Sequence, residues 1–550
     1  MTAEAGSRGQ LARRAGVVSA AVLASRVLGL VREQVFAVSF GAGKVLDAFI
    51  TAFRVPNLLR DLFGEGALSA AFVSTFTQEL ERNGERAAWR LANLVVNVLA
   101  VVVGAVCLLG VWAAPAITRA LAPGFADVPG KIELTVQLTR IMSPFLLLVA
   151  LAAVAMGILN TRHHFGIPAA ASAFFNAGSI VGGLACAHWL APGYLSTVFG
   201  SLRSGAAVAP EADLANRAIT GMAIGTLVGG VLQLAVQLPS LWRVGFRYRP
   251  ILSFRDPALR QVLRLMAPAT VGAAAVQVNV LVNSNFASYL GNGPVSWLNV
   301  AFRFMQLPIG LFGVAIGTVT LPLVSRHVAR SDAVAMKRVL RQALEMVALL
   351  CLPSAAGLAC FGVPVIGLIY EHGRFTAADT AAAAHALAGY AVGLAGYAGI
   401  KVLAPAFYAL GDARTPMRVS VLSMGVNLVL NWLFVRVLGF GVAGLALSTS
   451  AVALANCGVL LAMLRQCIGP LGGGLGGTLA RITGASALML IPAFAADAVV
   501  GRLMPPGPAA LAHALRVATV VPVAAGSFWA LCRALGVALP RLQRRRTPPA

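Results

Sequence analysis

Residues 91–117 read LANLVVNVLAVVVGAVCLLGVWAAPAI, and none of these side chains is charged. A helix of about 20 apolar residues is long enough to cross the roughly 30 Å hydrocarbon core of a bilayer. Runs of this kind recur from Val17 to Leu535. Of the 550 residues, 58% are hydrophobic and 11% are charged, whereas a soluble domain has about 25% charged residues. We therefore predict an all-α polytopic membrane protein.

The apolar runs predict fourteen transmembrane helices. They lie at residues 16–39, 45–78, 91–117, 132–159, 167–190, 219–241, 262–290, 294–325, 340–363, 381–410, 416–437, 441–464, 479–500 and 511–535. The net charge is +24, and the basic residues lie mostly in short stretches between these runs. Placing both termini in the cytoplasm puts most of them on the cytoplasmic side, as the positive-inside rule requires. The charge therefore indicates membrane topology, and we expect no nucleic acid as a partner.

A short internal repeat divides the chain. Ala52-Phe53-Arg54 with Leu62-Phe63-Gly64 matches Ala301-Phe302-Arg303 with Leu311-Phe312-Gly313, at an offset of 249 residues. Two six-helix lobes in parallel orientation would produce this pattern, and transporters built in this way hold their substrate between the repeats. We expect a cytoplasmic segment at 1–15, an N-lobe at 16–245, a C-lobe at 246–467, two further helices at 468–537 and a basic cytoplasmic tail at 538–550.

Signatures of enzymes and bound cofactors are missing from the sequence. No G-x-x-x-x-G-K-[ST] loop occurs, and Gly472-Gly-Gly-Leu-Gly-Gly477 follows no predicted strand, so we interpret it as a linker. The seven cysteines form no C-x-x-C pair, and the seven histidines have no metal-ligand spacing. We predict a protein that is not an enzyme and that has no catalytic residues, cofactor or metal site.

Charged residues inside the predicted spans are the strongest functional signal. They are Arg26, Arg32 and Glu33 in the first span, Asp47, Arg54, Arg60, Asp61 and Glu65 in the second, and Arg303 in the eighth. A charge at the centre of a membrane helix costs about 2.5–3.5 kcal/mol, so four arginines facing lipid would cost roughly 10 kcal/mol. These side chains must therefore face protein partners or a water-filled cavity.

Two interpretations of these charges are open. Residues seven apart share a helix face, so Asp47, Arg54 and Asp61 form one stripe and could be structural ion pairs. Such pairs do not explain Arg303, which has no acidic neighbour on its helix. Arginines in excess of acids favour an oxyanion such as phosphate or pyrophosphate, because the guanidinium group binds these anions bidentately.

Several short motifs occur in order along the chain. They are Ser25-Arg-Val-Leu-Gly29, Phe40-Gly-Ala-Gly43, Asp47-Ala-Phe49, Pro56-Asn-Leu-Leu-Arg60, Phe63-Gly-Glu-Gly-Ala67, Ala122-Pro-Gly-Phe-Ala126, Lys401-Val-Leu-Ala-Pro405 and Thr415-Pro416. From about residue 15 to 540 the sequence resembles the MurJ (MviN) family of lipid II flippases. The resemblance implies the multidrug/oligosaccharidyl-lipid/polysaccharide exporter fold, with two six-helix lobes around a central cavity and two C-terminal helices that form a groove for the lipid tail.

The resemblance also implies a set of site residues. The substrate-binding residues are expected to be Arg26, Arg32, Arg54, Arg60 and Arg303, and the cavity or gating acids Asp47 and Glu65. The sequence departs from the family at Phe302 and Gln306, where some members carry an acid, and at Asp61, where some carry an arginine. Because intramembrane acids are scarce in the second lobe, we expect membrane potential rather than a sodium gradient to drive transport.

The expected function is transport of lipid II, an undecaprenyl-pyrophosphate-linked disaccharide-peptide, to the outer leaflet of the bacterial inner membrane by alternating access. The expected partners are lipid II and membrane lipids, with cell-wall synthesis proteins as further candidates. The alternatives are an O-antigen or polysaccharide flippase and a multidrug antiporter of the same fold. An antiporter should carry intramembrane carboxylates for ion coupling rather than a cluster of arginines.

Overall fold

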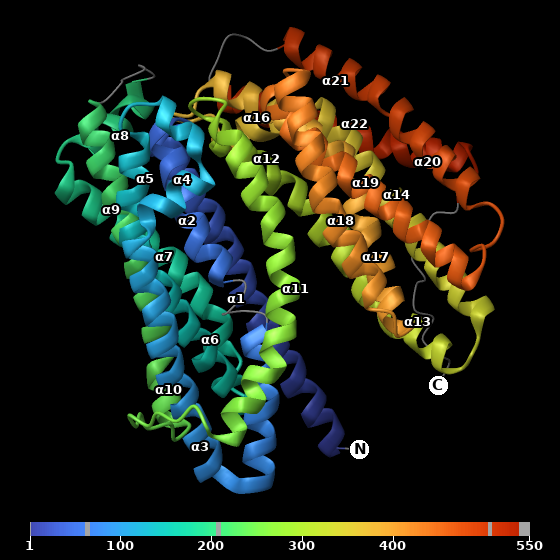
Figure 1. Cartoon of the computed structure of the whole chain (residues 1–550). Helices are drawn as coiled ribbons and strands as arrows, with labels where there is room; N and C mark the ends of the chain where they lie inside the picture. The colour runs from blue at the N-terminus through green and yellow to red at the C-terminus, as the bar shows by residue number, and fades with distance from the viewer. Residues whose placement is uncertain (1, 61–66, 205–210, 504–508, 538–550) are drawn as a thin grey trace. The chain divides into compact units, whose positions relative to one another are not determined.

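The computed structural model describes residues 2–60, 67–204, 211–503 and 509–537, and the regular elements in these ranges are all helices (Figure 1). Two units make up the chain and are described separately. The first unit comprises Met1–Ser296 and His372–Thr376, and the second comprises Trp297–Glu371 and Ala377–Ala550. The predicted all-α architecture is confirmed.

The regular elements in the described part of the first unit are α-helices and one short 3-10 helix. Its elements are α1 (Thr2–Phe40), α2 (Lys44–Arg60), α3 (Ala67–Trp112), α4 (Ala114–Leu121), η2 (Pro123–Asp127), α5 (Lys131–Met142), α6 (Phe145–Thr161), α7 (Gly166–Leu190), α8 (Tyr194–Ser204), α9 (Ala212–Ala235), α10 (Leu238–Arg243) and α11 (Pro257–Ser288). The break between α5 and α6 falls at Pro144, since proline has no N–H to donate to a carbonyl of the preceding turn.

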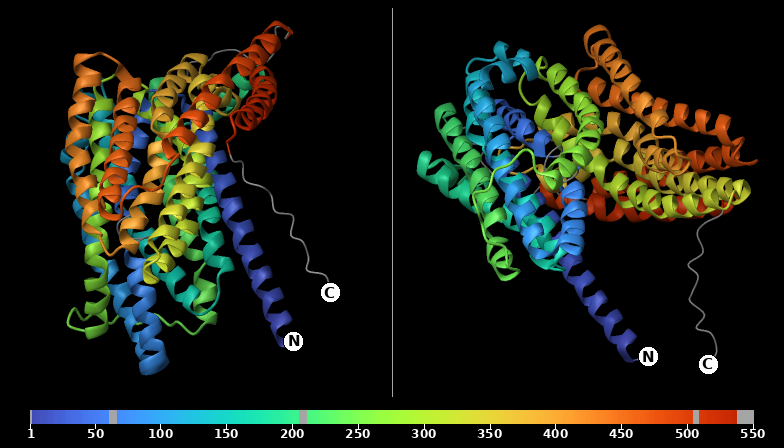
Figure 2. Two further views of the ribbon diagram at one scale, coloured as in Figure 1. Left: turned by 90° about the vertical axis from the view of Figure 1, so that its right-hand side faces the viewer. Right: turned by 60° about the horizontal axis from the view of Figure 1, so that its bottom comes forward.

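The regular elements in the described part of the second unit are all helices, and two of them are π-helical. Its elements are α12 (Pro294–Pro308, which begins in the first unit), η3 (Ile309–Val314), α13 (Ala315–Ala329), α14 (Ala333–Cys360), α15 (Gly362–Tyr370), α16 (Ala377–Val392), α17 (Leu394–Ala409), α18 (Arg414–Asn431), η4 (Trp432–Val437), α19 (Gly441–Ile468), α20 (Leu475–Leu488), α21 (Leu490–Leu503) and α22 (Ala509–Ala534). Helices α20 and α21, orange to red in Figure 2, pack against α22.

The predicted number of fourteen transmembrane helices is not confirmed by the length and hydropathy of the described helices. Ten helical segments of the described chain satisfy both conditions, and α16 with α17, bent by 42°, would make an eleventh. The remaining predicted spans correspond to α1, α2 and α11. Helices α1 and α2 carry the intramembrane charges, which lower their hydropathy, and α2 has 17 residues. The predicted helix 45–78 also has different boundaries, because α2 ends at Arg60 and α3 begins at Ala67.

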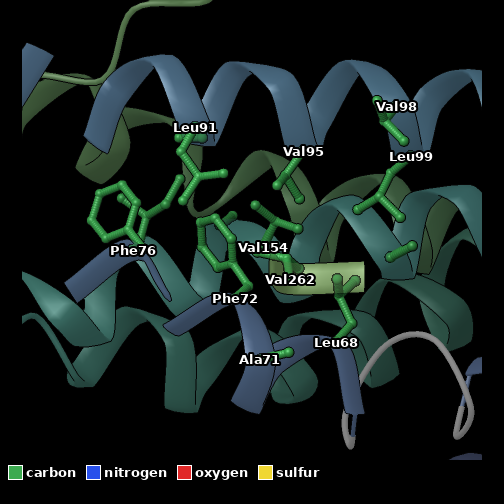
Figure 3. Packing of buried hydrophobic residues seen from close by; sticks show 14 of the residues in the cluster. Leu68, Ala71, Phe72, Phe76, Leu91, Val95, Val98, Leu99, Val154 and Val262 are labelled. Atoms are coloured by element: carbon green, nitrogen blue, oxygen red, sulfur yellow. The ribbon is translucent and has the colours of Figure 1, made fainter. Parts of the chain in front are cut away.

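Helix α3 consists of two stretches that meet at Gly84. This glycine has φ 79° and ψ 178°, which are not helical values. The rings of Phe76 and Trp89 lie 5.7 Å apart, whereas thirteen residues of continuous helix would separate them by about 20 Å. Figure 3 shows Phe72 and Phe76 packed opposite Leu91 and the residues after it. The chain therefore reverses at Gly84, between the predicted spans 45–78 and 91–117.

Glycines allow α7 and α9 to pack closely in the first unit (Figure 1). On α9, Gly221, Gly225 and Gly229 recur every four residues and share one face. A Cβ atom on Gly225 would lie 2.2 Å from the Cα atom of Gly183, and one on Gly229 would lie 2.5 Å from the carbonyl oxygen of Phe175. Small residues at this spacing let membrane helices approach closely and gain van der Waals contact. The contact fixes α7, against which α1 also packs.

We predict that Gly225→Leu prevents the close contact of α7 with α9. The leucine side chain has no space at a backbone separation this short, so we expect a loss of at least about 1–3 kcal/mol of stability. The measurement is the thermal unfolding midpoint of the purified full chain in detergent. Gly104→Leu on α3 is the matched control, because nothing lies within 4 Å of a Cβ atom there. Equal midpoints for the two variants would show that the α7–α9 contact is not needed.

Candidate functional site

Two of the predicted substrate-binding arginines lie on α1. The side-chain amide of Asn176 on α7 donates a hydrogen bond of 3.1 Å to the carbonyl oxygen of Ser25, which ties α1 to α7. Arg26 is exposed and forms no ion pair with any residue in the described ranges. Arg32 is half-buried, and its guanidinium carbon lies 5.0 Å from the centroid of the Phe175 ring, a cation–π contact. Helix α7 therefore orients Arg32 and leaves Arg26 accessible.

The other two arginines of the first unit lie on α2. Arg54 donates a hydrogen bond to the hydroxyl of Ser284 on α11, and that hydroxyl donates to the carbonyl oxygen of Val280 at 2.6 Å. Arg60 is half-buried in the last turn of α2, where the helix dipole favours a cation. Pro56 lies between the two arginines, and α2 continues through it. The hydroxyl of Ser284 therefore fixes the position of the Arg54 side chain.

Asp47, in the first turn of α2, has no exposed surface and accepts four hydrogen bonds. One carboxylate oxygen accepts from the Nζ atom of Lys131 at 3.0 Å and from the backbone N–H of Gly293 at 2.7 Å. The other accepts from the backbone N–H and the hydroxyl of Ser296, at 2.9 and 2.7 Å. An ion pair of Asp47 with Arg54 was one of the interpretations that the helical stripe left open; in the structure Asp47 pairs with Lys131 instead.

Lys131, the first residue of α5, is equally buried and fully coordinated. Besides Asp47, its ammonium group donates to the carbonyl oxygen of Gly291 at 3.1 Å and to the side chain of Asn292 at 3.0 Å. The ring centroid of Phe125 lies 4.1 Å from the same nitrogen. The turn that supplies these acceptors requires glycine, because Gly291 and Gly293 have φ of 90° and 104°. We call this set of contacts the Asp47–Lys131 network; it ties α2 and α5 to residues 291–296.

Sequence reasoning missed Lys131 because the lysine lies outside the predicted span 132–159. A signal for Ser296 was nevertheless present. Ser296 is 249 residues after Asp47, and this is the offset of the internal repeat. The two contacting residues therefore occupy equivalent positions in the two copies of the repeat.

A second buried network holds the segment His372–Thr376 within the first unit. The backbone N–H of Arg374 donates to the carbonyl oxygen of Val38 at 3.0 Å, and its guanidinium donates to the hydroxyl of Tyr194 at 3.0 Å. Burial raises the pKa of Tyr194, and the protonated hydroxyl donates to the carbonyl oxygen of Ser39 at 2.7 Å. A Cβ atom on Gly41 would lie 2.3 Å from the carbonyl oxygen of Arg374, which explains the glycine in the motif at 40–43.

Arg303 lies in the second unit, on α12, with an exposed side chain. Its neighbour Phe302 packs edge-on against Tyr390, with ring centroids 5.7 Å apart. Five residues beyond Arg303, Pro308 ends α12 and the π-helical segment η3 follows. Irregular turns of this kind within a helix often mark functional sites. Glu65 and Asp61 lie outside the described residues.

The fold and the charges define the class of protein. A chain of apolar membrane-length helices with arginines inside them is a polytopic helical membrane protein. Its fold is shared by an inward-facing multidrug resistance MATE family transporter of the MOP superfamily, with a TM-score of 0.65 at 14% identity over 81% of this chain and 95% of that one.

The chain belongs to the MurJ family. The family described as "Lipid II flippase MurJ" matches residues 36–504. A Burkholderia cenocepacia protein named lipid II flippase MurJ is 36% identical and covers 82% of this chain and 83% of its own length. A Vibrio cholerae protein named probable lipid II flippase MurJ is 37% identical and covers 81% of each. A solved structure titled "Lipid II flippase MurJ, inward closed conformation" has a TM-score of 0.73 at 26% identity and covers 94% of this chain and 99% of that one.

The Asp47–Lys131 network predicts a large loss of stability when one partner is removed. Asp47→Ala leaves a buried ammonium without its carboxylate, so we expect about 3–5 kcal/mol of destabilisation, and Lys131→Met should cost a similar amount. The double variant should lose clearly less than the two single losses combined. The measurement is unfolding of the purified full chain in detergent, arranged as a double-mutant cycle.

The matched control is the ion pair of Arg217 with Asp213 on α9, which is 2.8 Å long but more than 60% exposed on both sides. Asp213→Ala should cost no more than about 0.5 kcal/mol. If Asp47→Ala costs as little as Asp213→Ala, the buried pair does not stabilise the first unit.

Proposed function

We propose that this protein is a lipid II flippase, which moves undecaprenyl-pyrophosphate-linked disaccharide-peptide from the cytoplasmic to the outer leaflet of the bacterial inner membrane by alternating access. The observation that carries this proposal is the family match over residues 36–504, together with relatives of that name which align over four fifths of both chains. The protein is a transporter rather than an enzyme, and lipid II and membrane lipids are its partners. Cell-wall synthesis proteins are further candidate partners, and both termini lie in the cytoplasm.

The arginines supply the chemistry that a pyrophosphate needs. Arg26 is exposed, Arg32 lies against the aromatic ring of Phe175, and Arg54 donates to the hydroxyl of Ser284. Guanidinium groups bind phosphate oxygens in a bidentate manner, and inside a membrane the anion in turn offsets the cost of the buried cations. We assign Arg26, Arg32 and Arg303 to the pyrophosphate, with Arg54 and Arg60 shaping the site.

The two acids have a different role. Asp47 uses both carboxylate oxygens in four contacts within the protein, so it has no capacity left for a substrate group. We therefore assign Asp47 to gating, since it determines whether residues 291–296 stay attached to α2. Glu65 is assigned to the cavity by its position in the family motif alone.

A multidrug antiporter is less well supported than a flippase. The solved multidrug transporters share the fold at 14–15% identity, which carries no information about the substrate. The relatives at 36–37% identity bear the flippase name.

We predict that Arg26→Ala, Arg32→Ala and Arg303→Ala each abolish growth rescue of a strain depleted of its own lipid II flippase. Each substitution removes a guanidinium from the pyrophosphate while the helices remain in the membrane. The measurements are colony formation, membrane levels of the protein, and accessibility of lipid II at the outer leaflet. Lysine at the same positions keeps the charge and loses the planar fork, so it should rescue only partly.

Arg217→Ala on α9 is the control, because its side chain is exposed and pairs only weakly with Asp213. It should rescue growth fully. Full rescue by all three alanine variants of Arg26, Arg32 and Arg303 would refute the assignment of the substrate-binding set.

The energy source follows from the charge of the substrate. A pyrophosphate carries about two negative charges, and moving them out of an electrically negative cytoplasm gains roughly 4–5 kcal/mol per 100 mV. We predict that collapsing the membrane potential with valinomycin and potassium, at constant pH and sodium, slows the appearance of lipid II outside. Unchanged transport after this collapse, with loss of transport on sodium removal, would mean that sodium is the driving ion.

A further inference from the structure

A basic pocket lies in the second unit, and none of its lining residues belongs to the set assigned above. It has a volume of about 420 Å³ and lies between the first turns of α14 and the segment that joins α19 to α20. Its polar lining residues are Lys337, Arg338, Arg341, Gln342 and Glu345, all on α14. The opposite wall is formed by residues 470–472.

The positive charge of this pocket is only partly neutralised. Arg341 contacts Glu345 at 2.8 Å through Nε and donates a second hydrogen bond of 2.8 Å to the carbonyl oxygen of Gly473. Lys337 and Arg338 form no ion pair with any residue that the structure describes. The pocket therefore holds two cationic groups in excess. At the start of α14 the side chain of Asp332, which is not part of the pocket lining, accepts a hydrogen bond of 2.9 Å from the backbone N–H of Ala335 and caps the helix.

The glycine-rich segment is shaped around these side chains. Gly469, Gly472 and Gly474 have φ of 79°, 98° and 101°, which favour glycine. A Cβ atom on Gly469 would lie 3.1 Å from the Nζ atom of Lys337, and one on Gly474 would lie 3.6 Å from a terminal nitrogen of Arg341. The glycine-rich segment, which the sequence analysis interpreted as a linker, therefore forms one wall of the pocket.

The pocket lies where two membrane spans begin. Ala333–Cys360 and Leu475–Leu503 are both long and apolar enough to cross a bilayer, and the pocket is lined by the start of one and the residues just before the other. Further along, Leu349 on α14 packs with Ile482 on α20 in a buried apolar cluster. The basic groups therefore lie at the end of these spans, where lipid headgroups are found.

We propose that this pocket binds a phosphate group, as the headgroup phosphate of an anionic phospholipid or as a soluble phosphate. The guanidinium of Arg338 and the remaining N–H groups of Arg341 can donate hydrogen bonds to the oxygens of a phosphate, and the ammonium group of Lys337 adds a positive charge. A bound anion would compensate the two excess cations and join α14 to the segment before α20. This site is separate from the proposed transport site.

The test uses the purified full chain in neutral detergent and measures its thermal unfolding midpoint. The probes are dioctanoyl phosphatidylglycerol, inorganic phosphate and, as a zwitterionic control, dioctanoyl phosphatidylcholine. The pocket variant is Lys337→Gln with Arg338→Gln. The matched control is Arg326→Gln with Arg330→Gln, which removes the same charge from exposed arginines of the same unit.

Phosphatidylglycerol should raise the midpoint of the unmodified chain more than phosphatidylcholine does, and the pocket variant should need roughly tenfold more of it for the same shift. A shift with phosphatidylglycerol alone identifies a lipid headgroup, and a shift with inorganic phosphate as well identifies a soluble ligand. If the double variant is not recovered, Lys337→Gln and Arg338→Gln are tested singly.

Three outcomes would overturn the proposal: no anionic probe shifts the midpoint, the pocket variant responds like the unmodified chain, or the control variant loses as much as the pocket variant. The readout does not involve transport, so these outcomes leave the proposed flippase function unaffected.

Discussion

The ion pair of Asp47 with Lys131 takes two charges completely out of water, and the surrounding contacts have to repay that cost. Desolvation of each ion costs several kcal/mol even after relaxation, and the mutual attraction repays this only when the remaining hydrogen-bonding positions are filled. Here Gly293 and Ser296 fill them on the acid, and Gly291 and Asn292 fill them on the base. The geometry of the 291–296 turn is therefore set by the need to satisfy both charges.

The arginines of α1 and α2 make contacts of a different kind. The ring of Phe175 orients Arg32, and the hydroxyl of Ser284 orients Arg54. Asp47, by contrast, uses both carboxylate oxygens in contacts within the protein, so these contacts maintain the fold.

Much of the fold followed from the sequence, because hydropathy depends only on local composition. It gave the all-α membrane class and most span positions, and the reversal at Gly84 fell between two predicted spans. The partner of Asp47 could not be predicted in the same way. Helical phase relates residues on one helix, and it suggested Arg54; Lys131 is 84 residues away and becomes a neighbour only through tertiary packing. The pocket beside Lys337 was missed for the same reason, since it needs the path of a glycine-rich segment.

The contact between Asp47 and Ser296 also bears on how the two halves of the chain diverged. Asp47 and Ser296 occupy equivalent positions in the two copies of the repeat, and they contact each other. If the two copies were identical, the same residue type would stand on both sides of this contact. Two aspartates would repel at this distance, and two serines would leave Lys131 without a carboxylate. An acid in one half and a hydroxyl in the other avoids both costs, because Asp47 pairs with Lys131 and also accepts a hydrogen bond from the hydroxyl of Ser296. The divergence of the two halves at this position therefore stabilises the contact between α2 and residues 291–296.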